Sequence, residues 1–287
     1  MTLPTFFIIG AAKTGTTSLH YYLDQHPEIQ MSANKEPNFF SGPENGIPYP
    51  NGRVSDLAEY ERLFDPAVGV RGEASVGYTN FPRRKGIPER IKQLVPEAKF
   101  IYLVRDPIAR TVSQYHHRVA VEGERRTLRE ALSDLSDPQS VYIGHSLYAT
   151  QIELYLRYFS QESMLVLDQT DLLADRRATL RQIFAFLSVD ETFDSPRFAE
   201  ELNTNSEHRI YPRGYARLRG PRAPAAVRWI PRSVRHTVRH AVERMIMQPV
   251  EKSELDEETR ALLAERYRGE VERLRTLTGK SLSEWSI

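Results

Sequence analysis

The strongest constraint on the fold is an apolar segment that runs into a loop of small residues and then into a helical pattern. The apolar segment covers residues 5–9, Gly-Ala-Ala-Lys-Thr-Gly-Thr-Thr-Ser follows over residues 10–18, and helical spacing continues to residue 25. Backbone N–H groups at the start of such a helix have no internal acceptor and attract anions. This arrangement is typical of an α/β protein whose anion-binding loop follows a strand.

Apolar runs and helical patterns continue to alternate along the chain. They predict strands at residues 70–74, 99–104 and 164–167, and helices at residues 107–121, 147–159 and 177–187. Strands that alternate with helices favour a doubly wound, mainly parallel central sheet with helices on both faces. A charged amphipathic helix at residues 255–277 is expected to pack on this sheet.

The length and composition fit one globular domain over residues 1–287. With 40% hydrophobic and 27% charged residues, the chain can bury a sizeable core, which excludes a disordered or membrane-embedded chain. The net charge of +1 gives no reason to expect a nucleic-acid partner. The chain has no cysteine, and its first apolar run is too short for a membrane span and lacks the basic flank of a signal peptide. We therefore expect a cytoplasmic protein.

Two segments break the alternation. Residues 41–53 are rich in proline, glycine and asparagine, which predicts an exposed loop. Residues 209–242 contain nine arginines and no acidic residue, with apolar residues at every third or fourth position in the second half. Residues 209–244 are either a surface helix whose apolar side packs on the core, or a lid that closes on a bound nucleotide and contacts an acceptor or an anionic membrane surface. We favour the lid.

The loop after the first strand differs from the Walker loop of nucleoside triphosphatases in the place of its lysine. Gly10 and Gly15 have the Walker spacing, but Thr16 stands where the lysine belongs and Lys13 lies inside the loop. A lysine at this place is expected to reach a different part of the ligand.

A second candidate anion site follows the strand at residues 99–104. This strand ends in Arg105 rather than in the aspartate that helps to hold magnesium in triphosphatases, and Ser113 stands eight residues later. Carboxyl ends of parallel strands meet at one edge of a sheet, so the two sites together describe a nucleotide with two separate phosphates, bound without a metal.

These residues resemble the motifs of the sulfotransferases that use 3′-phosphoadenylyl sulfate (PAPS), in particular their carbohydrate, heparan-type and bacterial branch. Residues 13–19 resemble the loop for the 5′-phosphosulfate, and Arg105 with Ser113 resembles the 3′-phosphate motif. Lys-Glu-Pro-Asn-Phe-Phe at residues 35–40 is similar to the segment that carries a glutamate base. Further similar segments are residues 147–148, 165–168 and 282–285.

The resemblance implies a P-loop-like fold and an enzyme that moves a sulfuryl group from PAPS to a hydroxyl of a small-molecule, sugar or glycolipid acceptor, without a metal. The product would be 3′-phosphoadenosine 5′-phosphate (PAP). The resemblance assigns Glu36 as the base of an in-line displacement and Lys13 as the group that stabilises the departing oxygen. The residues that it assigns to binding of PAPS are Lys13, Thr14, Gly15, Thr16, Thr17, Ser18, Arg105, Ser113, Arg213 and Gly214.

Several alternatives stay open. Glu73 is a rival base. Ala74 stands where heparan-type enzymes usually carry a lysine, so the resemblance does not imply the contact that this lysine makes, or a sulfated polysaccharide as the acceptor. A small-molecule kinase, or a nucleotide-binding or membrane-binding module without catalysis, would also use an anion-binding loop. His116 and His117 diverge on a helix and do not predict a metal site, whereas His145 and His208 lie in acceptor-side regions. The sequence defines neither the acceptor nor the oligomeric state.

Overall fold

A five-stranded parallel sheet forms the centre of the protein. The computed structural model describes residues 1–42, 53–202, 209–210, 248–249 and 254–287. The strand order is β2-β3-β1-β4-β5, and every pair is parallel. The strands are β1 (Phe6–Gly10), β2 (Ile29–Met31), β3 (Val70–Ala74), β4 (Lys99–Val104) and β5 (Met164–Asp168). Because β1 lies between β3 and β4, the chain winds in both directions from the first strand, which confirms the predicted doubly wound α/β sheet.

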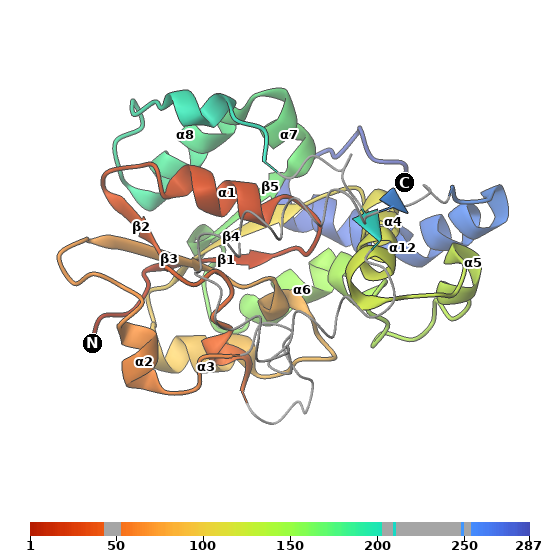
Figure 1. Cartoon of the computed structure of the whole chain (residues 1–287), viewed down its shortest axis with the longest axis horizontal. Coiled ribbons are helices and arrows are strands. Elements are labelled where there is room, and N and C mark those ends of the chain that lie inside the picture. Colours follow the sequence, from red (N-terminus) through yellow and green to blue (C-terminus); the bar gives the residue numbers. More distant parts are fainter. Residues whose placement is uncertain (43–52, 203–208, 211–247, 250–253) are drawn as a thin grey trace, which may run out of the picture.

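Helices cover both faces of the sheet (Figure 1). One face carries α1 (Thr16–Leu23), α7 (Gln169–Ala174) and α8 (Arg176–Leu187). The other carries α2 (Leu57–Glu61), α3 (Ile87–Leu94), α6 (Tyr148–Tyr155) and the long α12 (Glu257–Thr278). Beside the sheet lie α4 (Pro107–His117) and α5 (Leu128–Ala131), and the two-residue strands β6 (Arg209–Ile210) and β7 (Gln248–Pro249) pair antiparallel.

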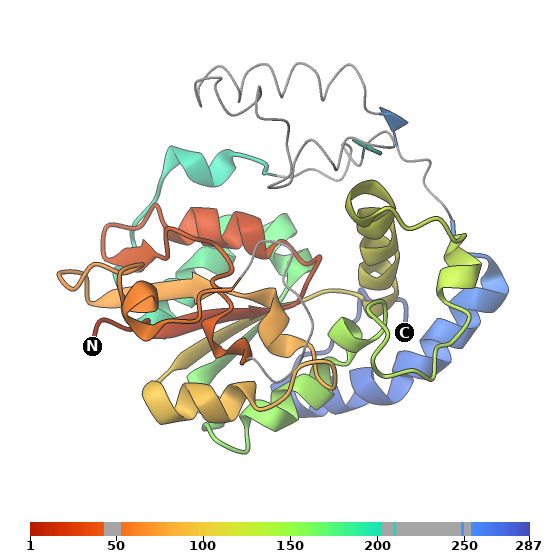
Figure 2. The same cartoon turned by 60° about the horizontal axis from the view of Figure 1, so that its bottom comes forward.

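The alternating side chains of β1 show how the core is divided. Phe6 and Ile8 pack in one apolar cluster with residues of α1 and α8, whereas Phe7 and Ile9 pack in the other with residues of α6 and α12. Successive side chains of a strand point to opposite faces, so a sheet that is covered on both faces needs apolar residues throughout. This three-layer arrangement (Figure 2) explains why the strands read as continuous apolar runs.

Several element ends differ from the prediction; the helix expected at residues 147–159, for example, is α6 and ends at Tyr155. The helix expected at residues 107–121 ends at His117, and a π-helical turn (Arg118–Glu122) follows and closes at Gly123 with a φ of 77°. The loop expected at residues 41–53 begins with a buried residue, because Ser41 ends a 3-10 turn (Phe39–Ser41).

Several expectations fall outside what the structure describes. Residues 43–52 and almost all of 209–244, with Arg213 and Gly214, lie outside the described residues. Within the described part of the chain, no helix is long and apolar enough to cross a membrane. The assignment of residues 1–287 to one domain stays a prediction.

Candidate functional site

The turn after β1 presents an uncapped helix start at the carboxyl edge of the sheet. Gly10 has a φ of 149°, and a Cβ there would lie 2.2 Å from Oγ1 of Thr79, so only glycine fits. Ala11 N–H donates to the carbonyl of Leu103 at 2.6 Å, which ties the loop to β4. Gly15, with a φ of 100°, precedes α1 and supplies no side-chain cap. The N–H groups of the first turn of α1 are therefore available to an anion.

Two hydroxyls of this loop donate hydrogen bonds to backbone carbonyls of the protein. Oγ1 of Thr14 donates to the carbonyl of Ala11 at 2.7 Å, inside the loop. Oγ of Ser18 donates to the carbonyl of Leu202 at 3.2 Å. The expectation that the hydroxyls of residues 14–18 bind the ligand stays a prediction, and in the ligand-free protein these two hydroxyls bond to backbone carbonyls.

Lys13 lies inside the loop, where burial and neighbouring cations disfavour its charge. Burial, followed by the positive charges of Arg110, Arg105 and Lys35, lowers the pKa of Lys13 to about 8. Within the described ranges, no carboxylate forms an ion pair with Lys13. An anion bound here would supply the missing negative charge.

Arg105 follows β4 and meets the loop directly. Its Nη1 donates to the carbonyl of Lys13 at 3.4 Å, and its own carbonyl accepts from the hydroxyl of Tyr148 at 2.8 Å. Burial lowers the pKa of Arg105. Ser113 lies in the second turn of α4 with 7% of its surface exposed. The structure thus brings Lys13 and Arg105 into contact, and Ser113 lies on the buried side of the adjoining helix.

Glu36 lies on a strained turn that β3 holds in place. The φ angles of Glu36 and Asn38 are 65° and 54°, in the left-handed region, which asparagine adopts readily but glutamate does not. Glu36 N–H donates to the carbonyl of Ala74 at 3.0 Å, and Asn38 N–H donates to Oγ of Ser75 at 3.2 Å. Nζ of Lys35 donates to Oε1 of Glu36 at 2.9 Å, and the Glu36 side chain is 27% exposed. The carboxylate is therefore ordered, charge-balanced and accessible.

Glu73 has the opposite environment. It is fully buried, and its Oε2 accepts from the hydroxyl of Tyr60 at 2.7 Å. Burial raises the pKa of Glu73 to about 7. Its other oxygen, Oε1, has no hydrogen-bond partner among the described residues, so Glu73 differs from Glu36 in being buried rather than accessible.

The histidines have different environments. Burial, followed by the charges of Arg110 and Arg83, lowers the pKa of His145 to about 3, so the ring is neutral near pH 7. His116 and His117 lie at the end of α4. Where the structure describes the chain, no group of three histidine or acidic residues could hold a metal ion. His208 lies outside the described residues.

Arg110 is a residue of this region that the sequence reasoning missed. It lies on α4 between Arg105 and Ser113 and is fully buried, and its charge is the largest charge effect on Lys13. The available signal was its place on the side of α4 that also carries the buried Pro107, Thr111 and Gln114, where a charged residue is unusual.

Several known proteins are similar in sequence to this chain. The sulfotransferase domain family matches residues 3–213. The bifunctional heparan sulfate N-deacetylase/N-sulfotransferase 4 of Mus musculus is 30% identical over 211 residues, which are 65% of this chain and 22% of that protein. The heparan sulfate glucosamine 3-O-sulfotransferase 3B1 of Mus musculus is 29% identical over 202 residues, which are 68% of this chain and 49% of that protein. The chain thus spans about a fifth and about half of the length of these two relatives.

A solved structure is also similar to this chain. A sulfotransferase from Alicyclobacillus acidocaldarius is 28% identical and covers 100% of both chains, with a TM-score of 0.71. The family match, with the phosphate loop after β1 and the arginine after β4, confirms the resemblance that the sequence motifs indicated. The chain belongs to the sulfotransferase family, whose sulfuryl donor is PAPS.

Proposed function

We propose that this chain transfers a sulfuryl group from PAPS to a hydroxyl group of a small-molecule, sugar or glycolipid acceptor. One observation carries the proposal: in the part of the chain that the structure describes, cations that form no ion pair with a carboxylate lie in the same region as an accessible carboxylate. Lys13, Arg105 and Arg110 interact around the uncapped start of α1. Lys35, which binds Glu36, is close enough for its charge to lower the pKa of Lys13.

The residues present fit a nucleotide that carries two anionic groups. The start of α1 offers N–H groups to one anion, and Arg105 with Ser113 can hold another beside the first turns of α4. One nitrogen of the buried Arg110, Nη1, has no hydrogen-bond partner in the described part of the chain. A buried N–H donor without an acceptor is expected where an anion binds, because the anion is the acceptor.

PAPS supplies an activated sulfur atom and a phosphate leaving group. Glu36 accepts the proton of the acceptor hydroxyl, whose oxygen forms a bond to sulfur as the bond from sulfur to the phosphate oxygen breaks. Lys13 and the N–H groups at the start of α1 stabilise the negative charge that develops on this departing oxygen. The turn around Glu36 is fixed by β3, which keeps the base in one orientation.

A small-molecule kinase has less support. Both carboxylate oxygens of Asp106, the first acidic residue after β4, are engaged in hydrogen bonds. Oδ1 accepts from Ala109 N–H at 2.7 Å, and Oδ2 accepts from N–H and Oγ of Ser286 at 2.6 and 2.7 Å. This carboxylate caps a helix and binds the C-terminal residues, rather than standing ready for a magnesium ion.

The test is the substitution Glu36→Gln, which removes the base and keeps the shape of the side chain. We expect unchanged affinity for PAP and a loss of roughly 10²- to 10⁴-fold in kcat, the usual contribution of a general base. Glu97→Gln, at an exposed carboxylate between α3 and β4, is the matched control and is expected to keep full turnover.

Turnover can be measured with PAPS and a panel of hydroxylated acceptors, and affinity by calorimetry with PAP. Glu73→Gln separates the two candidate bases. If Glu36→Gln retains normal turnover while Glu73→Gln loses it, the assignment of the base is wrong.

A further inference from the structure

Arg110 carries a buried charge that no carboxylate of the described residues neutralises in an ion pair. The side chain is completely buried on α4. It donates to Oγ of Ser146, to the carbonyl of Tyr142 and, at 3.4 Å, to Oγ1 of Thr111, all of which are neutral. Among the residues that the structure describes, no carboxylate forms an ion pair with Arg110. A buried cation without a counter-ion is strongly unfavourable, so an anion is expected.

The unpaired donor of Arg110 is itself buried. Nη1 has no hydrogen-bond partner within the described ranges, whereas Nε and Nη2 are both engaged. An arginine holds five N–H donors in a rigid fork that matches phosphate geometry. Neutral protein groups thus fix one side of the guanidinium and leave the other side without an acceptor.

The charge of Arg110 acts on the two cations that the sequence motifs identify. It lowers the pKa values of both Lys13 and Arg105, and for Lys13 it is the largest effect after burial. Three cations close together destabilise the ligand-free protein, because like charges repel over short distances at low dielectric. Anionic groups bound among them would relieve this repulsion.

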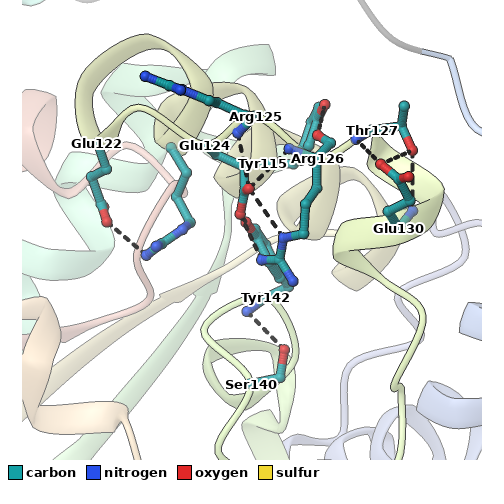
Figure 3. A network of polar contacts seen from close by, with 10 residues as sticks. Tyr115, Glu122, Glu124, Arg125, Arg126, Thr127, Glu130, Ser140 and Tyr142 are labelled. Carbon is teal, nitrogen blue, oxygen red and sulfur yellow. Dashed lines mark hydrogen bonds and ion pairs between the residues drawn. The ribbon is translucent and has the colours of Figure 1, made fainter.

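A polar network near the protein surface includes Tyr142 (Figure 3), whose carbonyl links this network to Arg110. The carboxylate of Glu124 accepts from the Arg126 side chain and, at 2.6 Å, from the hydroxyl of Tyr142. The carbonyl of Tyr142 in turn accepts from Arg110 and, at 3.2 Å, from Thr111. The hydrogen bond from Arg126 holds the pKa of Glu124 well below its usual range, so this network stays ionised at neutral pH.

We propose that Arg110 is a third cation of the PAPS site, and that the phosphate groups of the nucleotide, rather than a carboxylate of the protein, compensate its buried charge. This inference rests on the proposed function. It adds Arg110 to Lys13 and Arg105 as a nucleotide-binding residue. It predicts that the charge of Arg110 increases the affinity for the nucleotide and does not stabilise the ligand-free fold.

The test separates the charge of Arg110 from its hydrogen bonds. Arg110→Gln keeps amide donors for Ser146 and Tyr142 but removes the charge, and Arg110→Lys keeps the charge. We expect Arg110→Gln to bind PAP about 10- to 100-fold more weakly and Arg110→Lys to lose less. Without ligand, we expect Arg110→Gln to melt at or above the wild-type temperature. A lower melting temperature with unchanged affinity for PAP would overturn the proposal, since it indicates a purely structural arginine.

Two further variants complete the experiment. Arg177→Gln is the matched control, because Nε of the exposed Arg177 pairs with Oδ1 of Asp194 at 2.8 Å, and the affinity of this variant for PAP is expected to stay unchanged. Arg110→Met provides a second neutral side chain in case the glutamine variant does not fold. If both neutral variants fail to fold while Arg110→Lys folds, the fold itself needs the charge and the inference is wrong. If the wild-type protein does not bind PAP at all, the proposed function fails instead.

Discussion

Lys13 is a single residue whose charge depends on whether an anion is present. Burial and three neighbouring cations lower its pKa to about 8 in the ligand-free protein. A bound phosphate favours the charged form and therefore raises this pKa. By linkage, the affinity for PAP is greatest where Lys13 is protonated in both states. It decreases as the pH rises through the lower, ligand-free value.

We therefore expect the affinity of the wild-type protein for PAP to fall as the pH rises above about 8. Calorimetric titrations at a series of pH values on both sides of this point measure the effect. Lys13→Met is expected to bind PAP more weakly and without this decrease. An affinity of the wild-type protein that is constant between about pH 7 and pH 10 would contradict the role of Lys13.

At this scale, the sequence predicted the residues whose role follows from local spacing. Lys13 lies in a loop between a strand and a helix, and Arg105 directly follows a strand, so their places depend on a few neighbouring residues. The engagement of the Ser18 hydroxyl depends on the carbonyl of Leu202, which is distant along the chain. The burial of Arg110 depends on Tyr142 and on the packing around α4, which no local pattern encodes.

At the scale of elements, the start of α4 combines three functions in one turn. Asp106 caps the helix through Ala109 N–H, Pro107 occupies the first turn, and the preceding Arg105 meets the phosphate loop. The second carboxylate oxygen of Asp106 binds Ser286 near the C-terminus. The cap therefore also joins the C-terminal residues to the carboxyl edge of the sheet.

We expect Asp106→Ala to reduce the free energy of unfolding by about 2–4 kcal/mol, because it removes an N-cap and leaves groups of Ser286 without their acceptor. Asp56→Ala is the matched control: Asp56 caps the short helix α2 through one bond of 2.8 Å to Glu59 N–H at an exposed site. Its expected loss is only about 1 kcal/mol. Urea denaturation measures both variants, and equal losses would show that the bond to Ser286 contributes nothing.

The elements themselves were predictable to different degrees. β3 and β4 have the predicted bounds, because apolar runs flanked by turns are strong local signals. β2 was missed because it has three residues and pairs only with β3 at the sheet edge. The early end of α4 comes from the π-helical turn at Arg118–Glu122, whose bonding pattern has no signature in the order of apolar residues.

At the scale of the whole molecule, the ends of separate strands meet at one edge of the sheet and close around the site. The turn after β1 and the residues after β4 supply cations, and the turn held by the end of β3 supplies Glu36. Nε1 of Trp285 donates to Oδ2 of Asp168 at the end of β5, at 2.8 Å. Parallel strands thus assemble a site from segments that are distant in the chain, as expected for a doubly wound sheet.

A nucleotide that bridges these segments should stabilise the whole protein. At a concentration of PAP a hundred times its dissociation constant, binding adds about 2.7 kcal/mol to the free energy of unfolding. For a chain of this size, that is about 5–10 °C in melting temperature. Because Lys13, Arg105 and the start of α1 would neutralise the phosphates, the shift should be the same with magnesium and with a chelator.

Arg105→Ala should reduce the shift with PAP more than the shift with adenosine 5′-phosphate, which lacks the 3′-phosphate. Thermal melts of both proteins with both ligands measure these four shifts. A larger stabilisation by ATP with magnesium than by PAP would indicate that the site serves phosphoryl transfer rather than sulfuryl transfer.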